Sequence, residues 1–299
     1  MEIWIYFTLL AASMQAVRTA GQKQLSQHLN AMATTGVRYF YALPFAWLYL
    51  LWLVDFRDVE VPKLTSSFIQ YAVIACFAQI IGTACLVAAF RYRNFAVATS
   101  LAKTEAIQVA IFGALLFSAP LTGMGWFSVI IGVVGVFIVS KVKFNLKTIL
   151  NDSSSITGIG FGLASGLGLA ITTLLIRESS LALNSDLMVS AAVTLVFMIT
   201  LQSLISFIWI FLQDKSQLAK MITHWRLCVF VGVTSVLGSI GWFTGASYQN
   251  AAYVKALGQV EFFITLILTY RIFKEKISLI EYFGMFLIIA SVVILLVWA

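Results

Sequence analysis

The stretch Tyr92-Arg-Asn-Phe-Ala-Val-Ala-Thr-Ser-Leu-Ala-Lys-Thr-Glu105 recurs at an offset of 156 residues as Tyr248-Gln-Asn-Ala-Ala-Tyr-Val-Lys-Ala-Leu-Gly-Gln-Val-Glu261. Tyr, Asn and Glu stand at the same places in both copies, in one ungapped frame. Outside the stretch, the same offset pairs Gly82 with Gly238, Phe117 with Phe273 and Phe127 with Phe283. Matches of Leu, Ala and Phe arise easily by chance between apolar segments. The Tyr, Asn and Glu matches therefore indicate that the chain is a duplication.

The composition places the chain in a lipid bilayer. Of its 299 residues, 61% are apolar and 10% are charged, against about 25% charged in an ordinary soluble domain. The mean hydropathy is +0.97. A soluble chain of this length could not hide so much apolar surface, which excludes a cytosolic enzyme and a nucleic-acid-binding protein. The three cysteines lie in apolar segments without metal-ligand spacing, which excludes a disulfide-rich secreted scaffold.

Ten segments are long and apolar enough to span a membrane, which requires about 20 residues each. The longest link between them is the polar stretch 141–155, which predicts two halves at residues 1–150 and 151–299. The predicted spans are 3–22, 34–54, 66–89, 95–117, 121–140, 156–177, 186–212, 225–247, 251–271 and 278–298.

Each half contains five spans, an odd number, so the two copies must have opposite orientations in the membrane. The predicted fold is therefore an all-α membrane protein with ten transmembrane helices in two inverted five-helix repeats. Inverted repeats are typical of secondary transporters, whose binding site lies near the midplane of the bilayer, where the repeats meet.

The basic residues of the connections predict the orientation. Twelve lie after odd-numbered spans and three after even-numbered spans. Because cytoplasmic loops carry an excess of Lys and Arg, the first group is expected in the cytoplasm and both termini outside. The first group is Lys23, Arg91, Arg93, Lys141, Lys143, Lys147, Lys215, Lys220, Arg226, Arg271, Lys274 and Lys276, and the second is Arg57, Lys63 and Arg177.

The duplication and the stretch Tyr270-Arg-Ile-Phe-Lys-Glu-Lys-Ile-Ser-Leu-Ile-Glu-Tyr-Phe-Gly-Met285 resemble the EamA family of the drug/metabolite transporter superfamily. Glu261 and Glu275 look like the two acidic positions of that family. The resemblance implies ten helices, a central cavity lined by both halves, and transport of a small metabolite or drug-like solute. It also implies cytoplasmic termini, opposite to the charge count.

The sequence departs from the family pattern at three places. Ala106 and Phe262 stand where the family often has Pro, and Ala119-Pro120 replaces the acidic position of the first half.

Six charged residues lie inside predicted spans and away from the span ends, and each costs at least ~2.5–3.5 kcal/mol near the bilayer centre. They are Arg18, Arg38, Lys103, Glu105, Lys255 and Glu261. At 1.5 Å per residue, Glu105 and Glu261 both reach the midplane. We predict that they form a substrate or proton site, the alternative being buried ion pairs that serve packing.

Three of the other four are interpreted from helical geometry. Lys103 and Glu105 lie about 200° apart on a continuous helix, so they should not share a face, and only one of the columns Thr99/Lys103 and Glu105/Gln108 should face the cavity. Gln15, Arg18, Thr19 and Gln22 follow one helical stripe, which makes Arg18 a candidate pore residue. Arg38 lies nearer a helix end and is expected to reach the headgroups.

The predicted function is secondary transport of a small anionic or zwitterionic, amino-acid-like metabolite. Four cations against two carboxylates favour a solute with negative charge, and a protonatable Glu could couple transport to the proton gradient. Trp242 and Tyr248 could stack on the solute. The predicted substrate-binding residues are Arg18, Gln22, Lys103, Glu105, Gln108, Trp242, Tyr248, Lys255 and Glu261.

Three alternatives remain open at this point. Proton-coupled efflux of lipophilic cations would use the two glutamates directly, a lipid-modifying membrane enzyme would need a His or carboxylate cluster at the interface, and a channel would need repeating polar residues. We expect a multi-pass protein of the inner (plasma) membrane, monomeric or homodimeric. Its expected partners are a small-molecule substrate, membrane lipid and coupling protons, with no nucleic acid, cofactor or metal.

The glycine-rich stretch 158–168 lies inside a predicted span and is not a phosphate loop. Gly158, Gly162 and Gly166 form a ridge of small residues, which predicts close packing against another helix.

Overall fold

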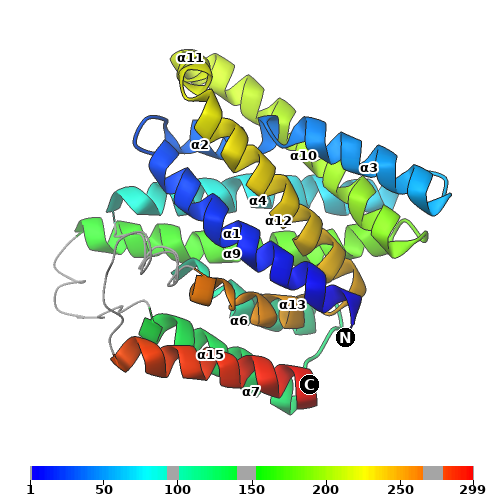
Figure 1. The fold of residues 1–299 in the computed structure, drawn as a ribbon, viewed down its shortest axis with the longest axis vertical. Coiled ribbons are helices and arrows are strands. Elements are labelled where there is room, and N and C mark those ends of the chain that lie inside the picture. The colour runs from blue at the N-terminus through cyan, green and yellow to red at the C-terminus, as the bar shows by residue number, and fades with distance from the viewer. Residues whose placement is uncertain (1, 93–100, 140–152, 265–278, 299) are drawn as a thin grey trace.

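The computed structural model describes residues 2–92, 101–139, 153–264 and 279–298, and within these ranges every regular element is a helix (Figure 1). The first half contains α1 (Ile3–Leu25), α2 (Ala31–Phe40), α3 (Leu43–Arg57), α4 (Ser66–Tyr92), α6 (Glu105–Leu116) and α7 (Gly123–Val139). The second half contains α9 (Ser153–Leu181), α10 (Leu187–Gln213), α11 (Ser216–Thr223), α12 (Trp225–Tyr248), α13 (Ala251–Gly258) and α15 (Leu279–Trp298).

Each of the ten predicted spans overlaps at least one of these helices. Five stretches are long and apolar enough to cross a membrane. The helices α6, α7 and α15 are apolar over shorter lengths. The five are 31–57, 66–90, 157–181, 187–213 and 225–248. The ends of the fourth and ninth predicted spans, at 95–100 and 265–271, lie outside the described residues.

The second span is two helices rather than the single one expected. Pro44 has no N–H with which to bond the carbonyl of Phe40, so the helix breaks at Tyr41 and Ala42 and α3 begins at Leu43. The equivalent position in the second half is Thr200, which leaves α10 unbroken over Leu187–Gln213.

The helix bounds confirm the duplication. Adding 156 to the α2–α3 pair (31–57) gives 187–213, the bounds of α10, and adding it to the last residue of α4 gives the last residue of α12. The helix starts correspond in chemistry as well. The side chain of Asn30 caps α2, and the equivalent Asp186 caps α10 by accepting from the N–H groups of Met188 and Val189 at 3.0 Å.

The two repeats are inverted, as predicted. In Figure 1, α1 leads away from the N-terminus at the right, whereas the equivalent α9 enters from the left, and α7 and α15 also run in opposite directions. Each repeat packs on the other through equivalent pairs, since α4 packs along α9 and α1 packs along α12. Both termini lie at the same end of the molecule (Figure 1).

Small residues allow these helix pairs to approach closely. A Cβ atom on Gly168 of α9 would lie 2.8 Å from the carbonyl oxygen of Ala78 and from Cα of Gly82 on α4. Two of the predicted ridge glycines also lie in contacts, since Gly162 faces Leu101 and Gly166 faces Thr104. Such contacts hold membrane helices together where lipid gives no hydrophobic drive between them.

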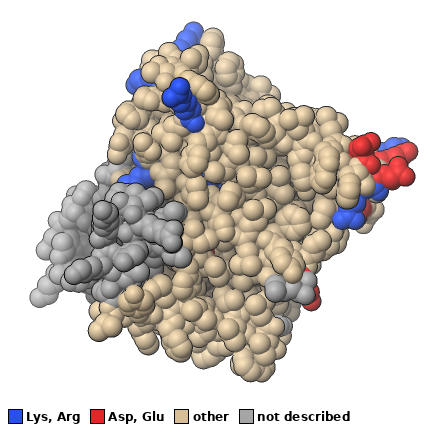
Figure 2. Space-filling model, in the orientation of Figure 1, with Lys and Arg blue, Asp and Glu red and all other residues tan. Residues whose placement is uncertain are grey.

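The surface charges gather at the ends of the helices. Figure 2 shows basic side chains over α11, acidic and basic ones together at the opposite end, and an almost uncharged face between them. This mixed end holds the α3–α4 and α9–α10 connections, which an ion pair between Arg57 and Asp186 joins at 3.8 Å. The uncharged face fits a lipid-facing surface. Which end lies in the cytoplasm remains a prediction of the charge count.

Candidate functional site

Two helices are interrupted at equivalent positions. In the first half the helix stops at Ala102, turns through Lys103 and Thr104, and resumes as α6 at Glu105. In the second half α13 ends at Gly258, residues 259–260 form the turn, and the helix resumes at Glu261. Each glutamate is therefore the first residue of a half-helix.

At both interruptions, backbone N–H groups donate to the carbonyl three residues back, instead of four as in an α-helix. The N–H of Thr104 donates to the carbonyl of Leu101 at 3.2 Å, and that of Ala106 donates to Lys103 at 3.3 Å. In the second half, the same pattern holds for the backbone N–H groups of residues 259, 260, 262 and 263, each of which donates to the carbonyl three residues back. Such 3₁₀-type bonds inside a helix often mark a functional hinge.

The interruption corrects one prediction. The 200° separation of Lys103 and Glu105 holds only on a continuous helix, and the turn lies between them. Both side chains line the same cavity. The prediction that only one of Lys103 and Glu105 faces the cavity is therefore wrong.

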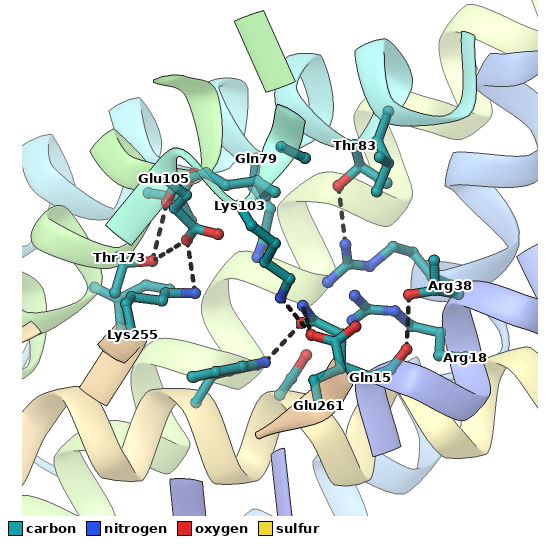
Figure 3. A pocket seen from close by; sticks show the side chains of 18 of the residues that line it. Gln15, Arg18, Arg38, Gln79, Thr83, Lys103, Glu105, Thr173, Lys255 and Glu261 are labelled. Carbon is teal, nitrogen blue, oxygen red and sulfur yellow. Dashed lines mark hydrogen bonds and ion pairs between the residues drawn. The ribbon is translucent and has the colours of Figure 1, made fainter. Parts of the chain in front are cut away.

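Crossed ion pairs join the two interruptions (Figure 3). Lys103 of the first repeat pairs with Glu261 of the second. Lys255 of the second repeat pairs with Glu105 of the first, with Nζ 2.7 Å from Oε1. The lysines are not equivalent residues, because Lys103 corresponds to Gln259 in the duplicated frame. In the duplicated frame the two lysines stand four residues, or about one helical turn, apart. Each repeat nevertheless supplies one lysine to the glutamate of the other.

Further donors hold each carboxylate. Gln15 Nε2 donates to Glu261 Oε2 at 3.0 Å, and Thr173 Oγ1 donates to Glu105 Oε1 at 3.2 Å. The glutamates are only 3% (Glu105) and 6% (Glu261) exposed. Burial with a paired cation and a second donor is the arrangement that allows a carboxylate to stay inside a membrane protein.

Trp242 of α12 connects the two pairs. Its Nε1 donates to Gln15 Oε1 at 2.8 Å, and Nζ of Lys255 lies 4.0 Å from the centroid of its ring. The ring face predicted to stack on a solute is therefore in contact with a cation, an attraction that is strongest on Trp.

A cavity of about 50 Å³ lies among these groups, with room for more than one water molecule. It is lined by α1, α2, α4, α6, α9, α12 and α13 together with the residues at the interruptions, so both repeats contribute. The polar and charged lining residues are Gln15, Arg18, Thr19, Gln22, Arg38, Gln79, Thr83, Lys103, Glu105, Thr172, Thr173, Ser239, Trp242, Lys255 and Glu261.

Arg38 corrects a second prediction. It does not reach the headgroups but is 5% exposed, lines the cavity, and donates from Nη1 to Thr83 Oγ1 at 2.9 Å. The break at Pro44 ends α2 shortly after this residue, so distance from the end of the predicted span was a poor guide to its depth.

The structure gathers seven of the nine predicted substrate-binding residues around the cavity: Arg18, Gln22, Lys103, Glu105, Trp242, Lys255 and Glu261. Gln108 and Tyr248 lie outside it. Gln108 Nε2 donates to Thr104 Oγ1 at 3.0 Å, on the side of α6 that faces Gly166 of α9. Tyr248 is the last residue of α12. Glu275, the second acidic position of the resemblance, lies outside the described residues.

The predicted set omitted Gln15, Arg38, Thr83 and Thr173. Gln15 belongs to the polar stripe of α1 and could have been included on that ground. Thr83 and Thr173 could not, since a lone Thr in an apolar helix commonly bonds its own backbone, as Thr173 Oγ1 also does to Leu169.

Comparison with known proteins identifies the family. The sequence model of the EamA-like transporter family matches the chain twice, at residues 2–141 and 156–297. The chain belongs to the EamA-like transporter family. It is a multi-pass membrane transporter of the drug/metabolite transporter superfamily, and the two matches coincide with the two repeats.

A solved structure shares the fold over almost the whole chain. A solved structure described only as "Crystal structure of protein" is 12% identical, covers 98% of this chain and 96% of its own, and has a TM-score of 0.70. This likeness shows the fold alone. No curated protein matches the sequence.

Proposed function

We propose that this EamA-family protein is a secondary transporter that moves a small anionic or zwitterionic, amino-acid-like metabolite across the inner membrane by alternating access. The observation that carries the proposal is the cavity between the repeats, in which each repeat pairs its glutamate with a lysine of the other. A solute bound there touches both repeats, which is the position that alternating access requires.

The crossed pairs supply a means of coupling. When the repeats rock, Lys103–Glu261 and Lys255–Glu105 must separate or rearrange. A zwitterion can satisfy both members of a pair, since its carboxylate binds a lysine and its ammonium binds a glutamate. A proton on Glu105 would neutralise the partner of Lys255, so protons could act as the coupling ion. Rearrangement then depends on what the cavity contains.

Efflux of lipophilic cations is less well supported. It requires glutamates free to bind the cation, and Glu105 and Glu261 are both already paired with lysines. Two further cations, Arg18 and Arg38, line the same cavity. A cation entering it would meet more positive than negative charge.

Uptake into proteoliposomes tests the proposal, with an amino-acid and carboxylate panel beside a lipophilic-cation panel, each with and without a pH gradient. We expect uptake of anions or zwitterions only. Glu105→Gln and Glu261→Gln should each lower uptake at least tenfold, because a neutral amide loses the charge that pairs with the lysine. Asp55→Asn removes an exposed carboxylate at the end of α3 and should transport normally.

Uptake confined to the cation panel would support the alternative. Normal transport by both glutamine variants would show that this cavity is not the transport site.

A further inference from the structure

The cavity holds more positive charge than its carboxylates can balance. Glu105 and Glu261 each have a lysine partner. Arg18 and Arg38 remain, and among the described residues no carboxylate lies within 4.0 Å of either guanidinium group. Both groups line the same cavity as the two paired glutamates (Figure 3). Within the described part of the chain, the site therefore carries two cations whose counter-charge is not supplied by an ion pair.

Hydrogen-bond donors in the same place lack acceptors. Nε of Arg18 and Nε2 of Gln22 are buried without a partner among the residues that the structure describes. The two residues are four apart on α1, hence on one face of that helix, and both line the cavity beside Arg38. Buried polar atoms are nearly always bonded in native proteins, so unpaired donors at a transport cavity point to a ligand that brings acceptor oxygens.

We propose that Arg18 and Arg38, with Gln22, form the subsite for a doubly charged oxyanion, so that the substrate is a phosphate monoester or a dicarboxylate. This inference rests on the proposed function and narrows its substrate class. Two guanidinium groups suit such a ligand because each presents a planar fork of donors that matches carboxylate or phosphate oxygens. A phosphate monoester carries about −1.5 to −2 at pH 7 and three acceptor oxygens.

The charge balance favours a doubly charged oxyanion over the other anions and zwitterions included in the proposed function. A zwitterion leaves both arginine charges unbalanced and a monoanion leaves one, whereas a dianion neutralises both. The two lysine–glutamate pairs can then stay intact while the ligand binds and rearrange only when the repeats rock, since the ligand does not need to replace either partner.

Binding to the purified full-length protein in detergent tests the inference. The probes are glycerol 3-phosphate, succinate, lactate and serine, compared at one ionic strength and pH 7.5. We expect glycerol 3-phosphate or succinate to bind at least tenfold more tightly than lactate and serine. Arg18→Gln and Arg38→Gln should each weaken that binding at least tenfold. Arg226→Gln removes the same charge from an exposed site on α12 and should bind normally.

Transport separates the failure of this inference from failure of the proposed function. If serine or lactate binds as tightly as both dianions and is carried into proteoliposomes, the dianion subsite is wrong and the transporter proposal stands. If no probe and no member of the wider anion and zwitterion panel is carried, the proposed function fails as well.

A melting curve without ligand gives an independent check on Arg18. Removing a buried charge that has no partner should leave the melting temperature of Arg18→Gln equal to or above that of the wild type. A fall as large as that of Glu261→Gln would show that Arg18 already has its counter-charge inside the protein, which overturns the inference.

Discussion

At the scale of single residues, the most consequential contacts are the two crossed ion pairs. Each joins a buried glutamate that starts a half-helix of one repeat to a partly buried lysine of the other repeat. Burying a charge is costly, and a partner with further hydrogen bonds offsets that cost. The pairs therefore connect the two repeats, and each glutamate depends on the opposite repeat for its counter-charge.

The pair between Lys255 and Glu105 can be tested by a double-mutant cycle. Among the described residues, Lys255→Met leaves Glu105 with Thr173 Oγ1 as its side-chain donor, and the unpaired carboxylate should lower the free energy of unfolding by about 3–5 kcal/mol. Adding Glu105→Gln removes that charge and should restore most of the loss. The measurement is unfolding of all four proteins in one detergent, and additive effects of the two substitutions would contradict the pairing.

At the scale of the elements, the interruptions decide which side chains meet. The N–H of Ala106 bonds only three residues back, to the carbonyl of Lys103 at 3.3 Å, and that of Phe262 does the same to Gln259 at 3.0 Å. These two positions are the ones where the EamA family often has Pro, a residue without an N–H. The chain therefore keeps the interrupted geometry with other residues at both sites.

Proline substitution tests this account of the interruption. Ala106→Pro falls in the first turn of α6, where proline is tolerated, and the variant should fold and transport within about threefold of the wild type. Ala110→Pro, one turn further along the same half-helix, removes an internal hydrogen bond and should cost about 3 kcal/mol or more. Folded yield and melting temperature in detergent compare the two, and equal losses would show that α6 is continuous with the preceding helix.

At the scale of the whole molecule, the repeats are held together by close helix pairs on either side of the cavity. Where α1 packs along α12, a Cβ atom on Gly241 would lie 2.4 Å from the carbonyl oxygen of Phe7 and 2.8 Å from Cβ of Ala11. On the same helix, a Cβ on Gly238 would meet its nearest neighbour, Cβ of Met14, at 3.4 Å. A side chain at position 241 would therefore prevent the close approach of α1 and α12, whereas one methyl group at position 238 would fit.

These two glycines provide a matched test of the packing between repeats. Gly241→Ala should lower the free energy of unfolding by about 1–3 kcal/mol, because the added methyl group forces the helices apart. Gly238→Ala should be neutral or stabilising by up to about 1 kcal/mol, since Ala favours the helix. Thermal unfolding in the same detergent decides, and a Gly241→Ala protein as stable as the wild type would contradict the close contact.

Properties that repeat along the chain were predictable. Hydropathy and the offset of 156 predicted the membrane fold, the ten spans and the inversion of the repeats, because each depends on local composition and on counting spans. The polar stripe of α1 predicted the exposure of Arg18 and Gln22 to the cavity, since helical periodicity places them on one face. The unusual cost of charge in a membrane singled out Glu105 and Glu261.

Which groups meet was decided only by the tertiary structure. Lys103 pairs with Glu261 and Lys255 with Glu105 because two helices break at positions that hydropathy does not mark, which also brings Lys103 and Glu105 to one cavity. Arg38 faces that cavity because α2, which ends at Phe40 ahead of Pro44, packs against α4. Gln108 does not, because its face of α6 lies against α9. Each outcome depends on contacts between segments far apart in the chain, whereas the periodicity of one helix defines only its own faces.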